Sequence, residues 1–206
     1  MKTRGKTLFL TQFGILLAIE AVFCFTPLGS IPLGVLVATL MCVPVIITAV
    51  LLGVKAGTLM GAFAGLFSFI VWTFTPPNPA VAFVFSPFAS LGEFSGNIGS
   101  VIICFVPRIL VGTVAGATFG AMKKIKGAND IVRYAVSAAL GSLTNTVGVL
   151  GLIWLIFGEQ YASVIGATIL YIVGFLTLTN GLPEAVVSAI LTPAICKPVK
   201  LILRQK

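Results

Sequence analysis

The chain has 206 residues, of which 58% are hydrophobic and 9% carry a charge. This composition lies far outside that of soluble domains and excludes a soluble globular protein. The formal net charge of +8 does not indicate a nucleic-acid partner here, because the basic residues form short clusters beside apolar segments, the positive-inside pattern of membrane proteins. We therefore predict a multi-pass protein of the cell membrane, surrounded by lipid.

The first apolar segment spans residues 7–26 and follows Lys2, Arg4 and Lys6. A signal peptide begins in the same way, but Glu20 interrupts this segment and no small-residue cleavage signal follows it. Since about 20 apolar residues cross a bilayer, we expect an uncleaved first span. Residues 27–32 form a short turn, because they begin and end with proline.

Two further spans are expected at residues 33–54 and 56–75, with Lys55 between them and a kink at Pro44. Residues 76–97 contain too many prolines and glycines for a span, so we expect a long outer loop that folds back onto the membrane face. Its aromatic residues Phe83, Phe85 and Phe88 are expected to act as a lid over a bound ligand.

The fourth span, residues 98–122, carries Arg108 directly after Pro107. A guanidinium inside hydrocarbon costs about 2.5–3.5 kcal/mol on insertion scales. Arg108 should therefore face a partner or a wet cavity rather than lipid.

The C-terminal part contains a fifth span at residues 131–157, an ambiguous apolar segment within residues 160–179, and a last span at residues 181–199. With six spans, every Lys and Arg other than Arg108 falls on one side of the membrane. A seventh span at 163–178 would place the C-terminal basic cluster on the opposite side. The predicted fold class is therefore an all-α bundle of six transmembrane helices in one domain, residues 1–206, with both termini cytoplasmic.

Two glycine ladders occur at four-residue spacing in the third and fourth spans. They are Gly57, Gly61 and Gly65, and Gly112, Gly116 and Gly120. Glycine at this spacing lets two helix backbones approach closely. The alternative is that glycine is simply common in membrane helices, and this chain has 22.

Polar residues gather in the outer half of the predicted bundle, where they form a candidate binding site. Arg108, Glu20, Asn145, Asn180 and Glu184 are expected to converge on an outward-facing pocket, since ionisable groups inside a membrane are functional by default. Trp72 and the Phe-rich loop, Phe88 included, are expected to wall this pocket. The alternative is structural: Arg108 pairs only with Glu20 or Glu93, and the asparagines bond only across helices.

Enzymatic and metal sites have no support in the sequence. There is no phosphate-binding G-x-x-x-x-G-K-[ST] motif, no histidine, and no pair of cysteines at metal-ligand spacing. We therefore predict no enzyme activity, no bound metal and no cofactor in this chain.

Several short segments, taken in order, resemble the substrate-binding S components of energy-coupling factor (ECF) transporters. They are Gly14-Ile-Leu-Leu-Ala18, Pro44-Val-Ile-Ile47, Leu51-Leu-Gly-x-x-x-Gly57, Pro107-Arg-Ile-Leu-Val-Gly112 and Asn180-Gly-Leu-Pro-Glu184. The resemblance covers nearly the whole chain and is strongest to the pantothenate-type and related vitamin S components.

This resemblance implies a six-helix bundle that captures a vitamin outside the cell, with pantothenate as the best candidate. It also implies docking on a transmembrane coupling subunit driven by two ATPases, so that ATP is used by the partners. Family members dock through a small-xxx-small motif on the first helix, which Gly14 and Ala18 match, with Gly where Ala is usual at the first position.

Two other functions remain open at this point. A self-sufficient secondary transporter or channel for a small organic anion would use Arg108, Glu20 and Glu184 for ion coupling, but the chain has no convincing inverted repeat. A membrane scaffold without a ligand would require Arg108 to be purely structural.

Overall fold

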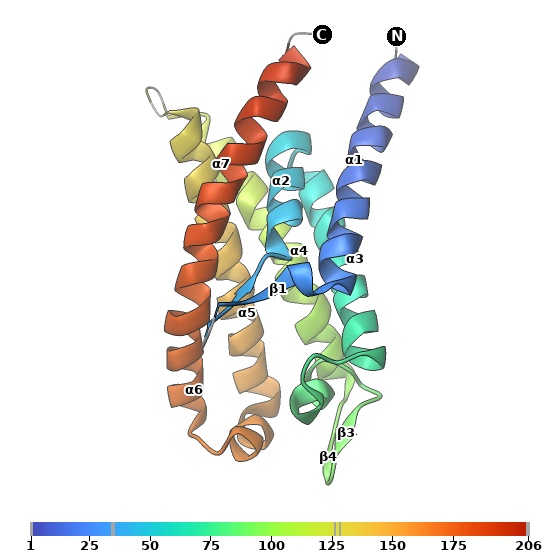
Figure 1. The fold of residues 1–206 in the computed structure, drawn as a ribbon, viewed down its shortest axis with the longest axis vertical. Helices are drawn as coiled ribbons and strands as arrows, with labels where there is room; N and C mark the ends of the chain where they lie inside the picture. Colours follow the sequence, from blue (N-terminus) through green and yellow to red (C-terminus); the bar gives the residue numbers. More distant parts are fainter. Residues whose placement is uncertain (1, 34–35, 126, 128, 205–206) are drawn as a thin grey trace.

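The computed structural model describes residues 2–33, 36–125, 127 and 129–204. These residues form an elongated helical bundle (Figure 1). Five helical segments in this part of the chain are long and apolar enough to cross a membrane, and α2 (Cys42–Leu52) is a shorter apolar helix. The long ones are α1 (Lys2–Phe25), α3 (Val54–Phe74), α4 (Ile98–Met122), α5 (Asp130–Ile165) and the rod that ends in α7 (Leu182–Arg204).

The two chain ends lie at the same end of the bundle, together with the end of α4 and the start of α5 (Figure 1). The opposite end holds the turn between α5 and α6 (Ile169–Leu176) and the hairpin of β3 (Ser90–Leu91) and β4 (Phe94–Ser95).

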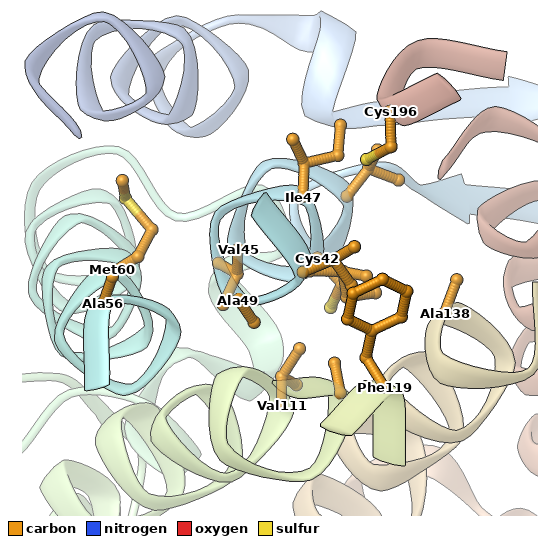
Figure 2. Packing of buried hydrophobic residues seen from close by; sticks show 14 of the residues in the cluster. Cys42, Val45, Ile47, Ala49, Ala56, Met60, Val111, Phe119, Ala138 and Cys196 are labelled. Carbon is orange, nitrogen blue, oxygen red and sulfur yellow. The ribbon is translucent and has the colours of Figure 1, made fainter. Parts of the chain in front are cut away.

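Helix α2 forms the centre of the half that contains the chain ends. Its residues from Cys42 to Val50 are all buried, as expected of a helix that is apolar on every side. Its one hydroxyl, on Thr48, donates to the Pro44 carbonyl at 2.7 Å. Side chains from α3, α4, α5 and α7 surround it (Figure 2).

We call this half the closed half. Its buried apolar residues are Phe13, Cys42, Val43, Val45, Ile46, Ile47, Ala49, Val50, Ala56, Met60, Ala64, Val111, Ala115, Phe119, Tyr134, Ala138 and Cys196. The rest of the bundle, from Arg108 of α4 to the α5–α6 turn, is called the open half.

The second span is shorter than predicted, and the expectation of a helix from residue 33 is wrong. The short helix η1 (Pro27–Gly29) is followed by the antiparallel strands β1 (Ser30–Leu33) and β2 (Leu36–Thr39), and α2 begins only at Cys42. The prolines at 27 and 32 disfavour a continuous helix here. The strands pair their own backbone groups, and β2 lies against α7, as non-helical backbone at membrane depth requires cover from protein.

The glycine ladders pack α3 directly against α4, which confirms the close helix contact predicted for them. A Cβ added at Gly57 or Gly112 would meet the other glycine's backbone, and one at Gly61 would meet the Arg108 carbonyl. The exception is Gly120, where no neighbouring atom of the described residues lies within 4 Å of an added Cβ. The close contact between α3 and α4 therefore reaches Gly116 but not Gly120, one helical turn further along α4.

The predicted loop at residues 76–97 is a folded cap on the open half. It contains η2 (Pro79–Val84) and the β3–β4 hairpin. Ser100 of α4 donates to the Phe83 carbonyl at 2.7 Å, and the Cys104 thiol to the Phe85 carbonyl at 3.0 Å. The Phe83 ring packs edge-on against Phe157 of α5, so the cap is held by both α4 and α5.

The ambiguous segment at residues 160–179 is helical and belongs to the last two helices. Helix α5 continues past a kink at Phe157 to Ile165, and Gly166, with φ of 75°, ends it in the left-handed conformation. Helix α6, the π-helical turn η3 (Thr177–Gly181) and α7 then follow one another as one rod. The last helix thus starts about twelve residues earlier than expected, and 163–178 makes no separate span.

Candidate functional site

The open half contains a cavity of about 690 Å³, a size within the range of small-molecule sites. Every long helix and the cap contribute to its wall. The lining residues are Phe23, Cys24, Phe25, Thr26, Pro27, Met41, Ser68, Val71, Trp72, Thr75, Pro77, Phe85, Arg108, Asn145, Thr146, Val149, Leu150, Leu176, Asn180 and Glu184. Of the seven predicted binding residues, this cavity brings together Trp72, Arg108, Asn145, Asn180 and Glu184.

Arg108 is half-buried in the cavity wall. Its Nη1 atom donates to the Ile103 carbonyl at 2.8 Å. Among the residues that the structure describes, no ion pair joins Arg108 to Glu20 or Glu93, the partners that a structural role would have used. The guanidinium is thus held by a neutral carbonyl through Nη1, one of its three nitrogens, and a guanidinium has five N–H donors in all.

Asn145 lies beside Arg108 at the deep end of the cavity. Both residues also border a second void of about 20 Å³ that extends towards α2, large enough for about one water molecule. The Oδ1 atom of Asn145 is buried, and within the described part of the chain it has no hydrogen-bond partner. A buried amide oxygen without a donor is costly, so this atom is ready to accept from a ligand.

The π-helical turn η3 brings the last two polar residues to the cavity. At Gly181 an added Cβ would lie 2.8 Å from Thr146, so the absence of a side chain allows η3 to approach α5 closely. Asn180 and Glu184 then face the same cavity as Thr146. Single π-helical turns are often found at functional sites, and no feature of the sequence predicted this one.

The apolar wall is built on Trp72 of α3, whose ring stacks on Phe85 of the cap with centroids 4.3 Å apart. Of the three aromatic residues expected to cover the ligand, Phe85 alone lines the cavity. Phe83 is 1% exposed inside the cap, and Phe88 is 78% exposed and contacts the Phe69 ring edge-on. The packing of the cap separates these rings.

Glu20 does not line the cavity either. It is 0% exposed within α1, where its Oε1 atom accepts from the Cys24 thiol at 3.3 Å, and its Oε2 atom has no hydrogen-bond partner among the described residues. Cys24 lies between Glu20 and the cavity.

The end of α1 and the residues that follow it also contribute to the cavity, which was not predicted from the sequence. Phe23, Cys24, Thr26, Pro27 and Met41 all line the cavity. The signal available was Pro27 directly after an apolar segment, which marks the end of a helix. Pro27 predicts that the helix ends, but it cannot predict that α2 begins only at Cys42 and leaves the space beside these residues unfilled.

Gly14 and Ala18 lie on the exposed face of α1, away from the cavity. Nothing lies within 4 Å of a Cβ added at Gly14, so this face carries a shallow strip on an otherwise bulky helix. As for metals, the described residues contain no group of three His, Cys, Asp or Glu side chains that could hold an ion.

A bundle of membrane-length helices with a cavity of small-molecule size in one half is the architecture expected of a membrane protein that binds a solute. Residues 8–196 match the family described as "ECF transporter, substrate-specific component". The chain belongs to this family and is a membrane-embedded transport protein, not an enzyme. This confirms the resemblance found in the sequence.

Two curated relatives are similar to this chain along most of its length. The pantothenic acid transporter PanT of Lactococcus lactis subsp. cremoris (strain MG1363) is 37% identical over 158 residues, which cover 76% of this chain and 74% of that protein. The pantothenate transporter PanT of Leuconostoc mesenteroides subsp. mesenteroides is 31% identical over 160 residues, which cover 71% of this chain and 68% of that protein.

Proposed function

We propose that this chain binds pantothenate in the open-half cavity and delivers it to an ECF module for uptake. The observation that carries the proposal is Arg108, a cation in the cavity wall that forms no ion pair with Glu20 or Glu93. A carboxylate on the ligand would be attracted to this guanidinium. The identity of 31–37% to two pantothenate transporters supports the same substrate.

The remaining polar residues of the cavity suit the rest of this ligand. Pantothenate is a small acid that also carries hydroxyl and amide groups. Arg108 would bind the carboxylate through two parallel N–H donors, and the Asn145 oxygen would accept from a hydroxyl or amide. Asn180 and Glu184 would bind the other hydroxyl and amide groups, while Trp72 and Phe85 would cover the apolar part.

We place the predicted site residues Glu20 and Phe88 in supporting positions. Glu20 would act through Cys24, to which it is hydrogen-bonded. Phe88 would act at the rim of the cap, where it contacts Phe69.

The topology that fits this function is a single six-helix domain with both termini in the cytoplasm. In support, the start of α1, the end of α4, the start of α5 and the end of α7 share one end of the bundle (Figure 1), and every Lys and Arg that the structure describes, except Arg108, belongs to segments at that end. The cavity then opens to the outside. Reporter fusions after residue 206 and within residues 123–130 should both report the cytoplasm, and an external C-terminus would contradict this topology.

The partners that fit are a transmembrane coupling subunit and two ATPase subunits. The exposed strip at Gly14 and Ala18 is the proposed docking surface on this chain, because two small side chains one turn apart leave room for another helix.

The test of the substrate is calorimetric binding of pantothenate to the purified chain. Arg108→Gln should weaken binding roughly ten- to over a hundredfold, because a charge-assisted hydrogen bond contributes about 1.5–3 kcal/mol. Arg108→Lys should fall between, since it keeps the charge and loses the two-pronged geometry. Thermal melts confirm that each variant is folded.

Two results would count against the proposal. A wild-type chain that does not bind pantothenate removes this substrate. Equal binding by all three proteins removes Arg108 from the site and leaves it with a structural role.

A further inference from the structure

Pro107, the residue before Arg108, is buried in the middle of α4. Proline has no backbone N–H, so the carbonyl four residues earlier in a helix loses its usual partner. In α4 that carbonyl belongs to Ile103. It is the same carbonyl that accepts from Arg108 Nη1 at 2.8 Å.

Water cannot readily replace Arg108 as the donor to the Ile103 carbonyl. Ile103 is 0% exposed, so water has little access to it, and a buried carbonyl without a donor is costly. Neighbouring helices also fix α4 at this point: a Cβ at Gly61 of α3 would meet the Arg108 carbonyl, and one at Gly148 of α5 would lie 3.2 Å from the Pro107 ring. The backbone therefore cannot move away to relieve the missing bond.

We infer that Pro107 is a positioning residue for ligand recognition: it frees the Ile103 carbonyl, which then anchors the Arg108 guanidinium in the cavity wall. This inference rests on the proposed function for the identity of the ligand. The anchor is neutral, so it orders the long Arg108 side chain without neutralising its charge. A carboxylate in the same place would have ordered the side chain and also cancelled the charge that an anionic ligand needs.

The first test needs no ligand and uses thermal unfolding of four proteins. These are wild type, Arg108→Met, Pro107→Ala and the double variant. Methionine cannot donate to the Ile103 carbonyl, whereas alanine at 107 restores the backbone N–H that can. The loss in melting temperature caused by Arg108→Met should be larger by about 2–6 °C when Pro107 is present than when alanine replaces it. Equal losses in the two backgrounds would overturn the inference.

The second test measures binding of pantothenate and of its alcohol analogue, in which a hydroxymethyl group replaces the carboxylate. Pro107→Ala should weaken pantothenate binding roughly two- to tenfold, because the ligand must now order the Arg108 side chain itself. It should leave binding of the alcohol unchanged. In an Arg108→Gln background, Pro107→Ala should cause no further loss.

The matched control is Pro193→Ala, which removes a second buried helix proline, in α7 and outside the cavity lining. Its pantothenate affinity should equal that of wild type. An equal loss for acid and alcohol, or a loss that persists without Arg108, would show that Pro107 only shapes the helix and would overturn the inference. If wild type does not bind pantothenate, the proposed function fails, and the melting cycle still decides whether Pro107 and Arg108 are coupled.

Discussion

The closed and open halves of this bundle are made from the same long, apolar helices, yet one is solid and the other holds a cavity of about 690 Å³. The difference is α2. In the closed half, its 11 residues occupy the centre and contact the surrounding helices. The residues that precede α2 form the β1–β2 hairpin instead, and no helix of the described residues takes the central place in the open half. A cavity thus arises in this bundle because one of its helices starts late.

The two halves also differ in where their charged and polar groups lie. The closed half carries its ion pairs at its end, where Asp130 binds Arg133 at 2.9 Å and Lys200 at 3.1 Å. The open half carries its cation inside, on Arg108, beside the amide oxygen of Asn145, which has no hydrogen-bond partner among the described residues. The charged groups of the closed half therefore lie at its end, whereas the open half keeps polar groups at its cavity, where the proposed ligand would meet them.

The largest expected effect concerns α1, on the outer surface of the closed half. Gly14→Trp combined with Ala18→Trp should abolish pantothenate uptake by the complete transporter, because the bulky rings fill the proposed docking strip. Binding by the isolated chain should stay intact, since the cavity lies in the other half. Uptake assays in cells and calorimetry on the purified chain measure the two effects.

Gly174→Trp on α6 is the matched control for this prediction. It places the same ring at an exposed glycine with nothing within 4 Å of an added Cβ. Uptake should survive there. Uptake that survives both tryptophans on α1 would remove the docking surface from this face.

The next effect is on stability in the closed half. Gly112→Ala should lower the free energy of unfolding by at least about 3 kcal/mol, the upper end of the range for overpacking, because the new Cβ meets the Gly57 backbone. Thermal unfolding in detergent measures the change. Gly120→Ala, on the same ladder but with no described residue within 4 Å of the new Cβ, should leave stability unchanged or slightly higher; a matching loss there would show that the loss at Gly112 does not come from its contact with Gly57.

A moderate effect is expected at the deep end of the cavity. Asn145→Ala should weaken pantothenate binding about two- to tenfold, because a neutral hydrogen bond contributes about 0.5–1.5 kcal/mol. Calorimetry measures the affinity. Thr144→Ala should not change it, since the Thr144 hydroxyl donates to the Leu140 carbonyl of its own helix at 2.7 Å and lies outside the cavity lining. Unchanged affinity for Asn145→Ala would mean that the ligand does not reach Asn145 at the deep end of the cavity.

The smallest effect belongs to the ion pairs at the end of the closed half. Asp130 is 39% exposed, and exposed pairs contribute about 0–1 kcal/mol. Asp130→Asn should therefore lower the melting temperature by no more than about 2–4 °C, and the difference should shrink in high salt. A larger, salt-independent loss would mean that these pairs help to hold α5 against α7.

Much of the site could be predicted from single residues. Arg108 stood out because a guanidinium within an apolar segment needs a polar setting, and the structure places it in the cavity with Trp72, Asn145, Asn180 and Glu184. The positions of Glu20 and Phe88 could not be predicted in this way. Neither side chain lines the cavity: Glu20 lies behind Cys24, and Phe88 is exposed on the cap. The rotation of α1 and the packing of the cap decide these positions, and neither has a sequence signal.

The sequence by itself determined that this is a membrane protein with long apolar helices, since composition and segment length decide how a chain meets lipid. It also determined the α3–α4 contact, because glycines at four-residue spacing favour close packing wherever two such ladders meet. Only the tertiary structure decided where α2 begins and how η3 turns Asn180 and Glu184 towards α5. The first outcome depends on the pairing of β1 with β2 and on their cover by α7, and the second on the close approach of Gly181 to Thr146 of α5. Contacts of this kind between separate elements have no local sequence signal.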